Sequence, residues 1–140
     1  MSPQQRSSAM KRVKLKNGPL ERVVQKELRS MGLRFRCHLK ALPGCPDIVF
    51  KKQRLVVFID GDFWHGWRFP AWEHKLNRFW REKIHANRAR DNRNFRRLRS
   101  KGWNVIRIWE HQLKDQSPKW RLNICRILLI NPPEQAYATR

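Results

Sequence analysis

The stretch DIVFKKQRLVVFIDGDFWHGW, residues 47–67, contains two short apolar runs separated by four polar residues. The runs Asp47–Phe50 and Leu55–Ile59 are rich in β-branched and aromatic residues, which favour strands. The KKQR link between them is too short for a crossover connection, so we expect the two strands to pair as an antiparallel hairpin. The second run then ends in two acids and a histidine among large aromatic residues, which no strand requires.

Hydrophobic periodicity predicts three helices and one more strand around this hairpin. Apolar residues recur at helical spacing from Pro19 to about residue 31, where Gly32 ends the run, and again over about 75–101. Residues 104–109 alternate as a strand does, and a last helix is predicted over about 119–129. The order αββαβα predicts an α/β fold in which helices flank a small mixed sheet.

The charge of the chain indicates a polyanionic partner. Among 140 residues, Lys and Arg number 32 against 11 Asp and Glu, a net charge of +21. Aromatic residues make up 11% of the chain, which excludes a disordered basic tail and leaves room for a real core. We expect a basic arm over 1–18, one domain over 19–131 and a loose tail over 132–140, with nucleic acid as the first candidate partner.

Cysteine usage and hydropathy indicate a cytoplasmic protein. The three cysteines form no CxxC pair, which favours reduced thiols over a disulfide framework. No segment is long and apolar enough to cross a membrane, and the basic N-terminal stretch lacks the apolar region of a signal peptide.

Two acids lie on or beside apolar helix faces. Asp91 lies between Ile84 and Phe95 on the apolar face of the helix predicted over about 75–101. A buried carboxylate is costly unless it is paired. Its partner could be one of the many arginines, in a purely structural ion pair. Glu21 lies beside the stripe of the first helix, although an acid in a first turn is also favoured by the helix dipole.

The hairpin brings the beginning of one strand near the end of the next. We therefore expect Asp47 and Asp60 to be neighbours, and a divalent cation commonly relieves the repulsion between close carboxylates. Asp47 alone could instead form an Asx-turn or cap. His65 follows, and histidine is the residue type best suited to exchange protons near neutral pH. Carboxylates that hold Mg²⁺ and an imidazole that accepts a proton are the parts needed to hydrolyse a phosphodiester.

Four blocks of the sequence resemble the very-short-patch repair (Vsr) endonucleases and the related EDxHD nucleases. The blocks are LPGCPDIVF, VVFIDGDFWHG, FWREKIHANRARD and GWNVIRIWEHQL, and the resemblance covers about residues 6–115. Pro46-Asp47, followed twelve residues later by Phe58-Ile59-Asp60, resembles the PD-(D/E)xK nuclease core. The resemblance implies a restriction-endonuclease-like three-layer sandwich. It also implies a Mg²⁺-dependent endonuclease that nicks one strand of double-stranded DNA and leaves a 5′-phosphate.

The resemblance also implies roles for the reacting residues. Asp47 would be the principal Mg²⁺ ligand, helped by the Ile59 backbone carbonyl. Asp60, where the chain departs from the family pattern, would add a second carboxylate. His65 would be the general base, and Asp91 the acid that orients it.

Further matches concern the first helix and the DNA. Glu21 matches a family glutamate near the metal. Phe63, Trp64 and Trp80 match aromatics that wedge between base pairs, Met10 matches a methionine that inserts from the opposite groove, and Lys83 lies beside the wedge. Core packing is the alternative for these aromatic residues.

The sequence departs from the family pattern at two places. Where Vsr enzymes hold a structural zinc, this chain has Asp62, Trp67 and His111, so we expect no zinc and hypothesise a direct Asp62–His111 pair. Asp60 stands where family members often have a second histidine, which leaves T:G mismatch specificity open.

Two other functions fit the same features. One is a homing-type or defence-associated nuclease that cuts a specific sequence. The other is a basic DNA-binding module with little catalysis. For the nuclease we expect a monomer, with mismatch-repair or defence proteins as possible partners.

Overall fold

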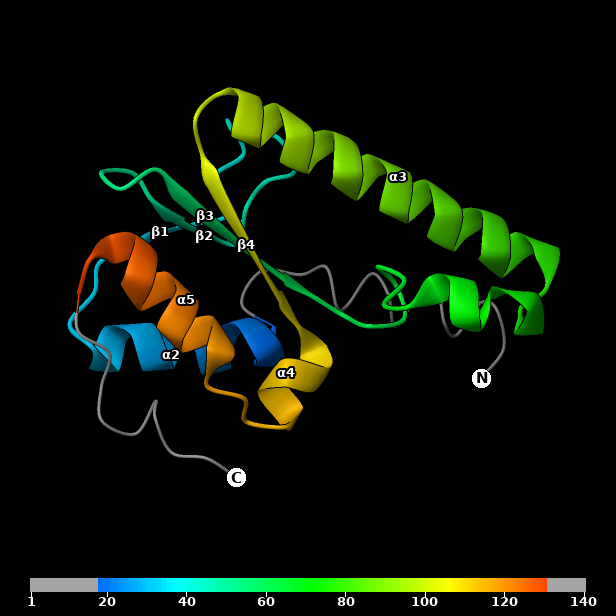
Figure 1. Cartoon of the computed structure of the whole chain (residues 1–140), viewed down its shortest axis with the longest axis horizontal. Coiled ribbons are helices and arrows are strands. Elements are labelled where there is room, and N and C mark those ends of the chain that lie inside the picture. The colour runs from blue at the N-terminus through cyan, green and yellow to red at the C-terminus, as the bar shows by residue number, and fades with distance from the viewer. Residues whose placement is uncertain (1–17, 131–140) are drawn as a thin grey trace. The chain divides into compact units, whose positions relative to one another are not determined.

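The computed structural model describes residues 18–130, which fall into two compact units divided after Arg34 (Figure 1). The described residues leave out most of the expected basic arm, residues 1–17, which includes Met10. They also leave out the tail expected over 132–140. The single domain expected over 19–131 stays a prediction. Within the described range, none of the helices has the length and apolar character that a bilayer crossing requires.

In the first unit, the described residues 18–34 contain one helix, α2 (Pro19–Ser30). Pro19 opens it, where the missing N–H costs no helical hydrogen bond. Gly32, with φ of 77°, closes it in the left-handed region. The Gly32 N–H donates to the Arg29 carbonyl at 2.9 Å, and the Leu33 N–H donates to the Leu28 carbonyl at 3.1 Å. The predicted helix is therefore confirmed to within one residue.

The second unit contains a four-stranded mixed sheet. Its strands, in spatial order, are β1 (Arg36–Cys37), β2 (Ile48–Phe50), β3 (Leu55–Asp60) and β4 (Asn104–Trp109). β2 and β3 pair antiparallel, as predicted, and β3 and β4 pair parallel. β1 was not predicted, because two residues carry no periodicity.

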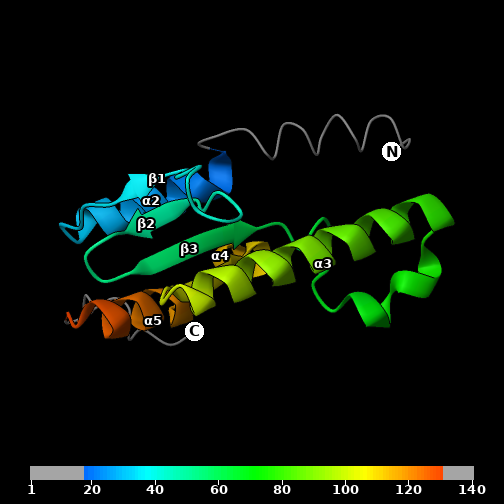
Figure 2. The ribbon, with the colours of Figure 1, turned by 90° about the horizontal axis from the view of Figure 1, so that it is seen from above.

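Three α-helices accompany this sheet within the described residues: α3 (Arg78–Ser100), α4 (Glu110–Lys114) and α5 (Lys119–Leu128). Two short 3-10 helices, Phe69–Ala71 and Glu73–Lys75, precede α3. α3 connects the parallel strands and extends well beyond them (Figure 2). It begins three residues later than predicted, because the Asn77 side chain caps it by accepting the Trp80 N–H at 3.1 Å. α4, a single turn after β4, was not predicted. The mixed α/β class with helices around a small mixed sheet is confirmed.

The core beneath α3 determines which side chains of β3 and β4 point toward this helix. Val56 and Phe58 of β3 cluster with Phe95 and Leu98 of α3, and the rings of Phe58 and Phe95 meet edge to face at 5.0 Å. Because strand residues alternate between faces, Asp60 continues the face of Phe58 toward α3. Val105 of β4 packs on the same cluster, so Arg107 lies on that face too.

Leu98→Ala tests the importance of this core. Leu98 is fully buried, and its truncation is expected to lower the free energy of unfolding by about 2–5 kcal/mol. Urea unfolding measures the change. The matched variant Arg96→Ala, on the exposed side of α3, is expected to stay within about 0.5 kcal/mol of the wild type. Equal effects of the two variants would contradict the assignment of this cluster as the core.

Candidate active site

The loop after β3 turns back toward α3 and carries the histidine with it. The His65 N–H donates to the Gly61 carbonyl at 3.2 Å, and Gly66 has φ of 72°. The buried Asn87 of α3 donates its side-chain N–H to the Trp64 carbonyl at 2.8 Å. This hydrogen bond explains why a polar residue lies on the buried face of α3, because Asn87 fastens the loop to the helix.

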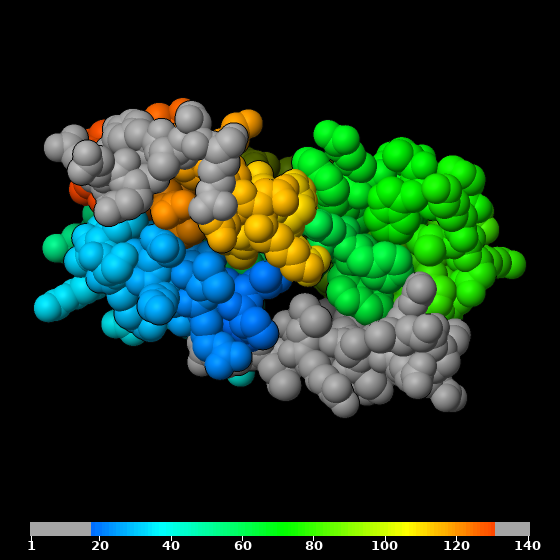
Figure 3. Space-filling model, turned by 90° about the horizontal axis from the view of Figure 1, so that it is seen from below, coloured from blue at the N-terminus to red at the C-terminus, as the bar shows by residue number. Residues whose placement is uncertain are grey.

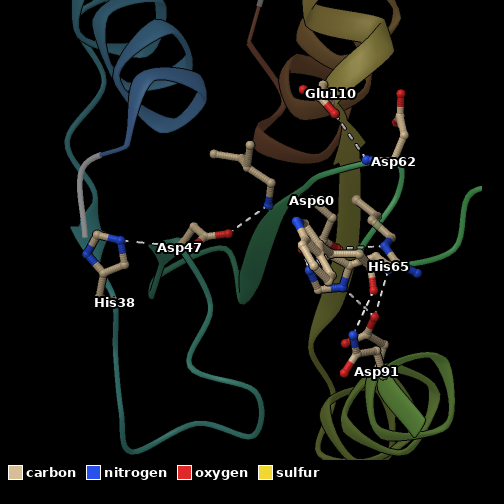
Figure 4. A network of polar contacts seen from close by, with 11 residues as sticks. His38, Asp47, Asp60, Asp62, His65, Asp91 and Glu110 are labelled. Atoms are coloured by element: carbon tan, nitrogen blue, oxygen red, sulfur yellow. Dashed lines mark hydrogen bonds and ion pairs between the residues drawn. The ribbon is translucent and has the colours of Figure 1, made fainter. Parts of the chain in front are cut away.

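His65 and Asp91 meet as the sequence predicted. Nδ1 of His65 lies 2.7 Å from Oδ2 of Asp91 (Figure 4). The same oxygen accepts a hydrogen bond from Nη2 of Arg107 at 2.8 Å. Asp91 therefore has both of the partners that the sequence left open, an imidazole and an arginine.

Asp60 contacts an arginine and the histidine. Its Oδ2 accepts from Nε of Arg107 at 2.7 Å, and its Oδ1 lies 3.3 Å from Nε2 of His65. Burial raises the pKa of the Asp60 carboxyl, opposed by the charges of His65 and Arg107. The guanidinium of Arg107 is thus a counter-charge for this carboxylate, and Asp60 as a second metal ligand stays a prediction.

Asp47 lies at the beginning of β2, next to the end of β3. Its Oδ2 accepts from the backbone N–H of Ile59 at 2.7 Å, and its Oδ1 lies 3.9 Å from Nε2 of His38. The carboxylate is thus fixed beside the residue whose carbonyl was expected as the second ligand. A carboxylate and a backbone carbonyl are the hard oxygen donors that Mg²⁺ prefers, so this donor set fits the ion.

The base His38 and the acid Glu21 differ in how they could be predicted. The sequence gives no signal for His38, which reaches Asp47 because the chain after β1 runs beside β2; the His38 N–H donates to the Asp47 carbonyl at 3.2 Å. Glu21 lies in the first turn of α2, within the first unit, and its place near the metal stays a prediction.

The predicted DNA-contacting aromatics form one cluster with Trp72. Phe63 stacks on Trp72 at 5.6 Å and meets Trp64 edge to face at 4.9 Å, and Trp64 lies 5.5 Å from Trp80. Trp80 is only 3% exposed. The segment 63–72, which carries Phe63, Trp64 and Trp72, forms part of the surface beside α4; in Figure 3 the segment is green and α4 is yellow.

Phe79 is an exposed aromatic residue at the N-terminal end of α3. No role for it was predicted from the sequence. It is 54% exposed and meets Trp80 edge to face at 4.9 Å. Nζ of Lys83 lies 5.8 Å from the ring of Phe79 and 5.9 Å from that of Trp80. Lys83 is thus beside the aromatic cluster, as predicted.

The hypothesised pair of Asp62 and His111 is confirmed. Oδ1 of Asp62 lies 2.9 Å from Nδ1 of His111, and the Asp62 N–H donates to Oε1 of Glu110 at 3.3 Å. The ring of Trp67 lies 4.6 Å from that of His111. These contacts join the loop after β3 to α4 directly.

Comparison with known proteins gives consistent matches. The family model for DNA mismatch endonuclease Vsr matches residues 1–70. The type II nicking enzyme V.XorIIP of Xanthomonas oryzae pv. oryzae is 44% identical over 117 residues, covering 82% of this chain and 86% of that protein. The DNA mismatch endonuclease Vsr of Escherichia coli is 36% identical over 114 residues, covering 78% and 71%. The type II nicking enzyme V.HpaIIP of Haemophilus parainfluenzae is 35% identical over 128 residues, covering 89% and 91%.

The Asp62–His111 pair generates a prediction about zinc. The two side chains are hydrogen-bonded to each other, and Trp67 occupies the third position of the family's zinc site. We therefore expect well under one zinc per chain in purified protein. Elemental analysis of the protein measures this. Chelator treatment is expected to leave the melting temperature unchanged, whereas Asp62→Ala lowers it. Stoichiometric zinc would contradict the prediction.

Proposed function

Since this chain belongs to the Vsr family of DNA endonucleases, we propose that it nicks one strand of duplex DNA in a Mg²⁺-dependent reaction centred on Asp47 and His65. It is a hydrolase that acts on DNA, from a family of metal-dependent nucleases. The proposed products are a 5′-phosphate and a 3′-hydroxyl. The observation that carries the proposal is the 2.7 Å contact between His65 Nδ1 and Asp91 Oδ2.

That contact supports a general-base role for His65. A proton on Nδ1, donated to the Asp91 carboxylate, leaves the lone pair on Nε2. Because Oδ1 of Asp60 lies 3.3 Å from Nε2, the attacking water is proposed to take the place of that contact before Nε2 accepts its proton. The loop bonds from Asn87 and Gly61 hold the ring in place against α3. Asp91 is itself held by Arg107, so the orienting carboxylate has little freedom to turn.

The donor set at Asp47 supports magnesium binding. The residues that would hold the ion are Asp47, through its carboxylate, and Ile59, through its carbonyl, with Glu21 as a further acid from the first helix. When bound, Mg²⁺ neutralises charge on the phosphoryl oxygens and lowers the pKa of coordinated water. The Ile59 N–H contributes by fixing the Asp47 carboxylate before any ion arrives.

The aromatic cluster and the cationic surface support DNA binding. Phe63, Trp64 and Trp80 are proposed to stack against bases, with Lys83 beside them on the phosphate backbone; Met10 is proposed to insert from the other groove. Trp80 is buried in the cluster, so its role is to support the outer rings until DNA engages them. Phe79, exposed next to Lys83, is a further candidate for base stacking.

The finer assignment is mismatch-linked nicking by a monomer in the cytoplasm, with mismatch-repair proteins as partners. Cutting of one specific matched sequence, with defence proteins as partners, is the other nuclease function considered. A basic module without catalysis is disfavoured, because the named relatives are endonucleases and nicking enzymes.

Asp47→Ala and His65→Ala test the proposed centre. Each is expected to reduce nicking of duplex DNA in Mg²⁺ by at least about 100-fold, because one lacks the ion's main carboxylate and the other lacks the base. DNA affinity, measured by fluorescence anisotropy, is expected to persist. Asp115→Ala and His74→Ala, at exposed positions, are matched controls that retain activity. Wild-type nicking by Asp47→Ala would remove the assignment.

A pool of matched and mismatched duplexes tests the specificity. Sequencing of the cut ends is expected to show that mismatched duplexes are nicked at least about tenfold faster, since unstacking a mismatch costs less. Trp64→Ala is expected to lose this preference, and Trp64→Phe to keep most of it because a ring remains. Cleavage at one matched sequence without mismatch preference would instead favour the defence or homing function.

A further inference from the structure

Arg107 lies between two acids and two aromatic rings. On β4, its Nε donates to Asp60 at 2.7 Å and its Nη2 donates to Asp91 at 2.8 Å. The guanidinium carbon lies 4.0 Å from the ring centre of Trp109 and 5.0 Å from that of Phe95. The planar, five-donor guanidinium suits such a position, because it can bind two carboxylates while its face stacks on a ring.

His65 closes these contacts into a ring of four side chains. Asp60 reaches Nε2 of His65 at 3.3 Å, and Asp91 reaches Nδ1 at 2.7 Å. The order around the ring is Asp60, His65, Asp91 and Arg107, so acids and bases alternate. Each ring nitrogen of the imidazole therefore faces one carboxylate, and Arg107 holds both carboxylates from the other side.

The two carboxylates require such a partner. The side chains of Asp60 and Asp91 are only 8% and 10% exposed. Two buried carboxylates around one imidazole repel each other, and removal of a shared counter-charge leaves an uncompensated buried charge. Without the guanidinium, either acid would turn toward solvent or compete for the imidazole.

We propose that Arg107 is a positioning residue of the nicking reaction. It holds Asp91 on Nδ1 of His65, and it keeps Asp60 within this group of four side chains rather than on the metal. The inference rests on the proposed function and deepens it, because it states what orients the general base. Metal binding then depends on Asp47, on the other side of the hairpin end, and not on Asp60. Arg107 acts through the two acids, without contact with the reacting phosphate.

The first test is single-turnover nicking at saturating DNA and Mg²⁺. Arg107→Lys keeps a positive charge but cannot bind both acids in the same plane, so we expect a roughly 10- to 100-fold slower cleavage step with unchanged DNA affinity. Arg126→Lys, on the exposed side of α5, is the matched control and is expected to nick at the wild-type rate.

Melting temperature separates positioning from folding. Arg107→Lys is expected to stay folded at the assay temperature, so that a slower step reflects a misplaced His65. A second variant, Arg107→Met, removes the positive charge altogether. If it fails to fold, the double variant Asp60→Asn with Arg107→Met removes a charge of each sign. This double variant is expected to regain folding without regaining the wild-type cleavage rate. A wild-type rate in Arg107→Lys would overturn the inference, and so would a loss of activity that merely follows the unfolded fraction.

The second test asks which acid binds the metal. Mn²⁺ binding to the whole protein, measured by electron paramagnetic resonance, is expected to be unchanged in Asp60→Asn and lost in Asp47→Ala. The Mg²⁺ concentration for half-maximal nicking is expected to change less than about twofold in Asp60→Asn, although the rate falls. Loss of Mn²⁺ binding in Asp60→Asn would overturn the inference. Failure of the wild-type protein to nick any duplex would instead overturn the proposed function, and this inference with it.

Discussion

Two carboxylates buried beside one histidine are possible here because a single guanidinium binds both of them. Asp60 comes from the end of β3, Asp91 from α3, and Arg107 from β4. Their contacts at 2.7 and 2.8 Å connect three elements that are distant in sequence. Since breaking a buried ion pair is far more costly than the pair itself is stabilising, the arrangement is strongly constrained once formed. The placement of His65 depends on it.

In the proposed mechanism, proton transfer and metal binding use different residues. Asp47 is fixed from the backbone, by the N–H of Ile59, and so its orientation follows from the pairing of β2 and β3. His65 is fixed by side chains from α3 and by turns in its own loop. The parallel pairing of β3 and β4 places Arg107 opposite Phe58, from where its long side chain reaches Asp60. The proposed catalytic site thus lies where the hairpin, the crossover helix and β4 meet.

Some of these contacts followed from local sequence rules and others did not. The hairpin was predictable because four polar residues cannot span a crossover, and Asp91 because a carboxylate on an apolar stripe needs a partner. The pairing of Asp62 with His111 was predictable because both replace ligands of one family site. Arg107 was not predictable, since it is one of 32 basic residues and an alternating strand accepts arginine on an exposed face. β1 and α4 were too short to leave a periodic pattern.

The sequence by itself determined the α/β class, the main elements to within a few residues, and the residue types suited to phosphodiester hydrolysis. These follow from periodicity, turn chemistry and a large positive charge, all of which are local or additive properties. Only the tertiary structure decided how the acids are shared. Asp60 pairs with Arg107, because parallel strand pairing brings a guanidinium to a carboxylate 47 residues away in the chain. Charge compensation in a buried site depends on distance in space, which a sequence pattern does not contain.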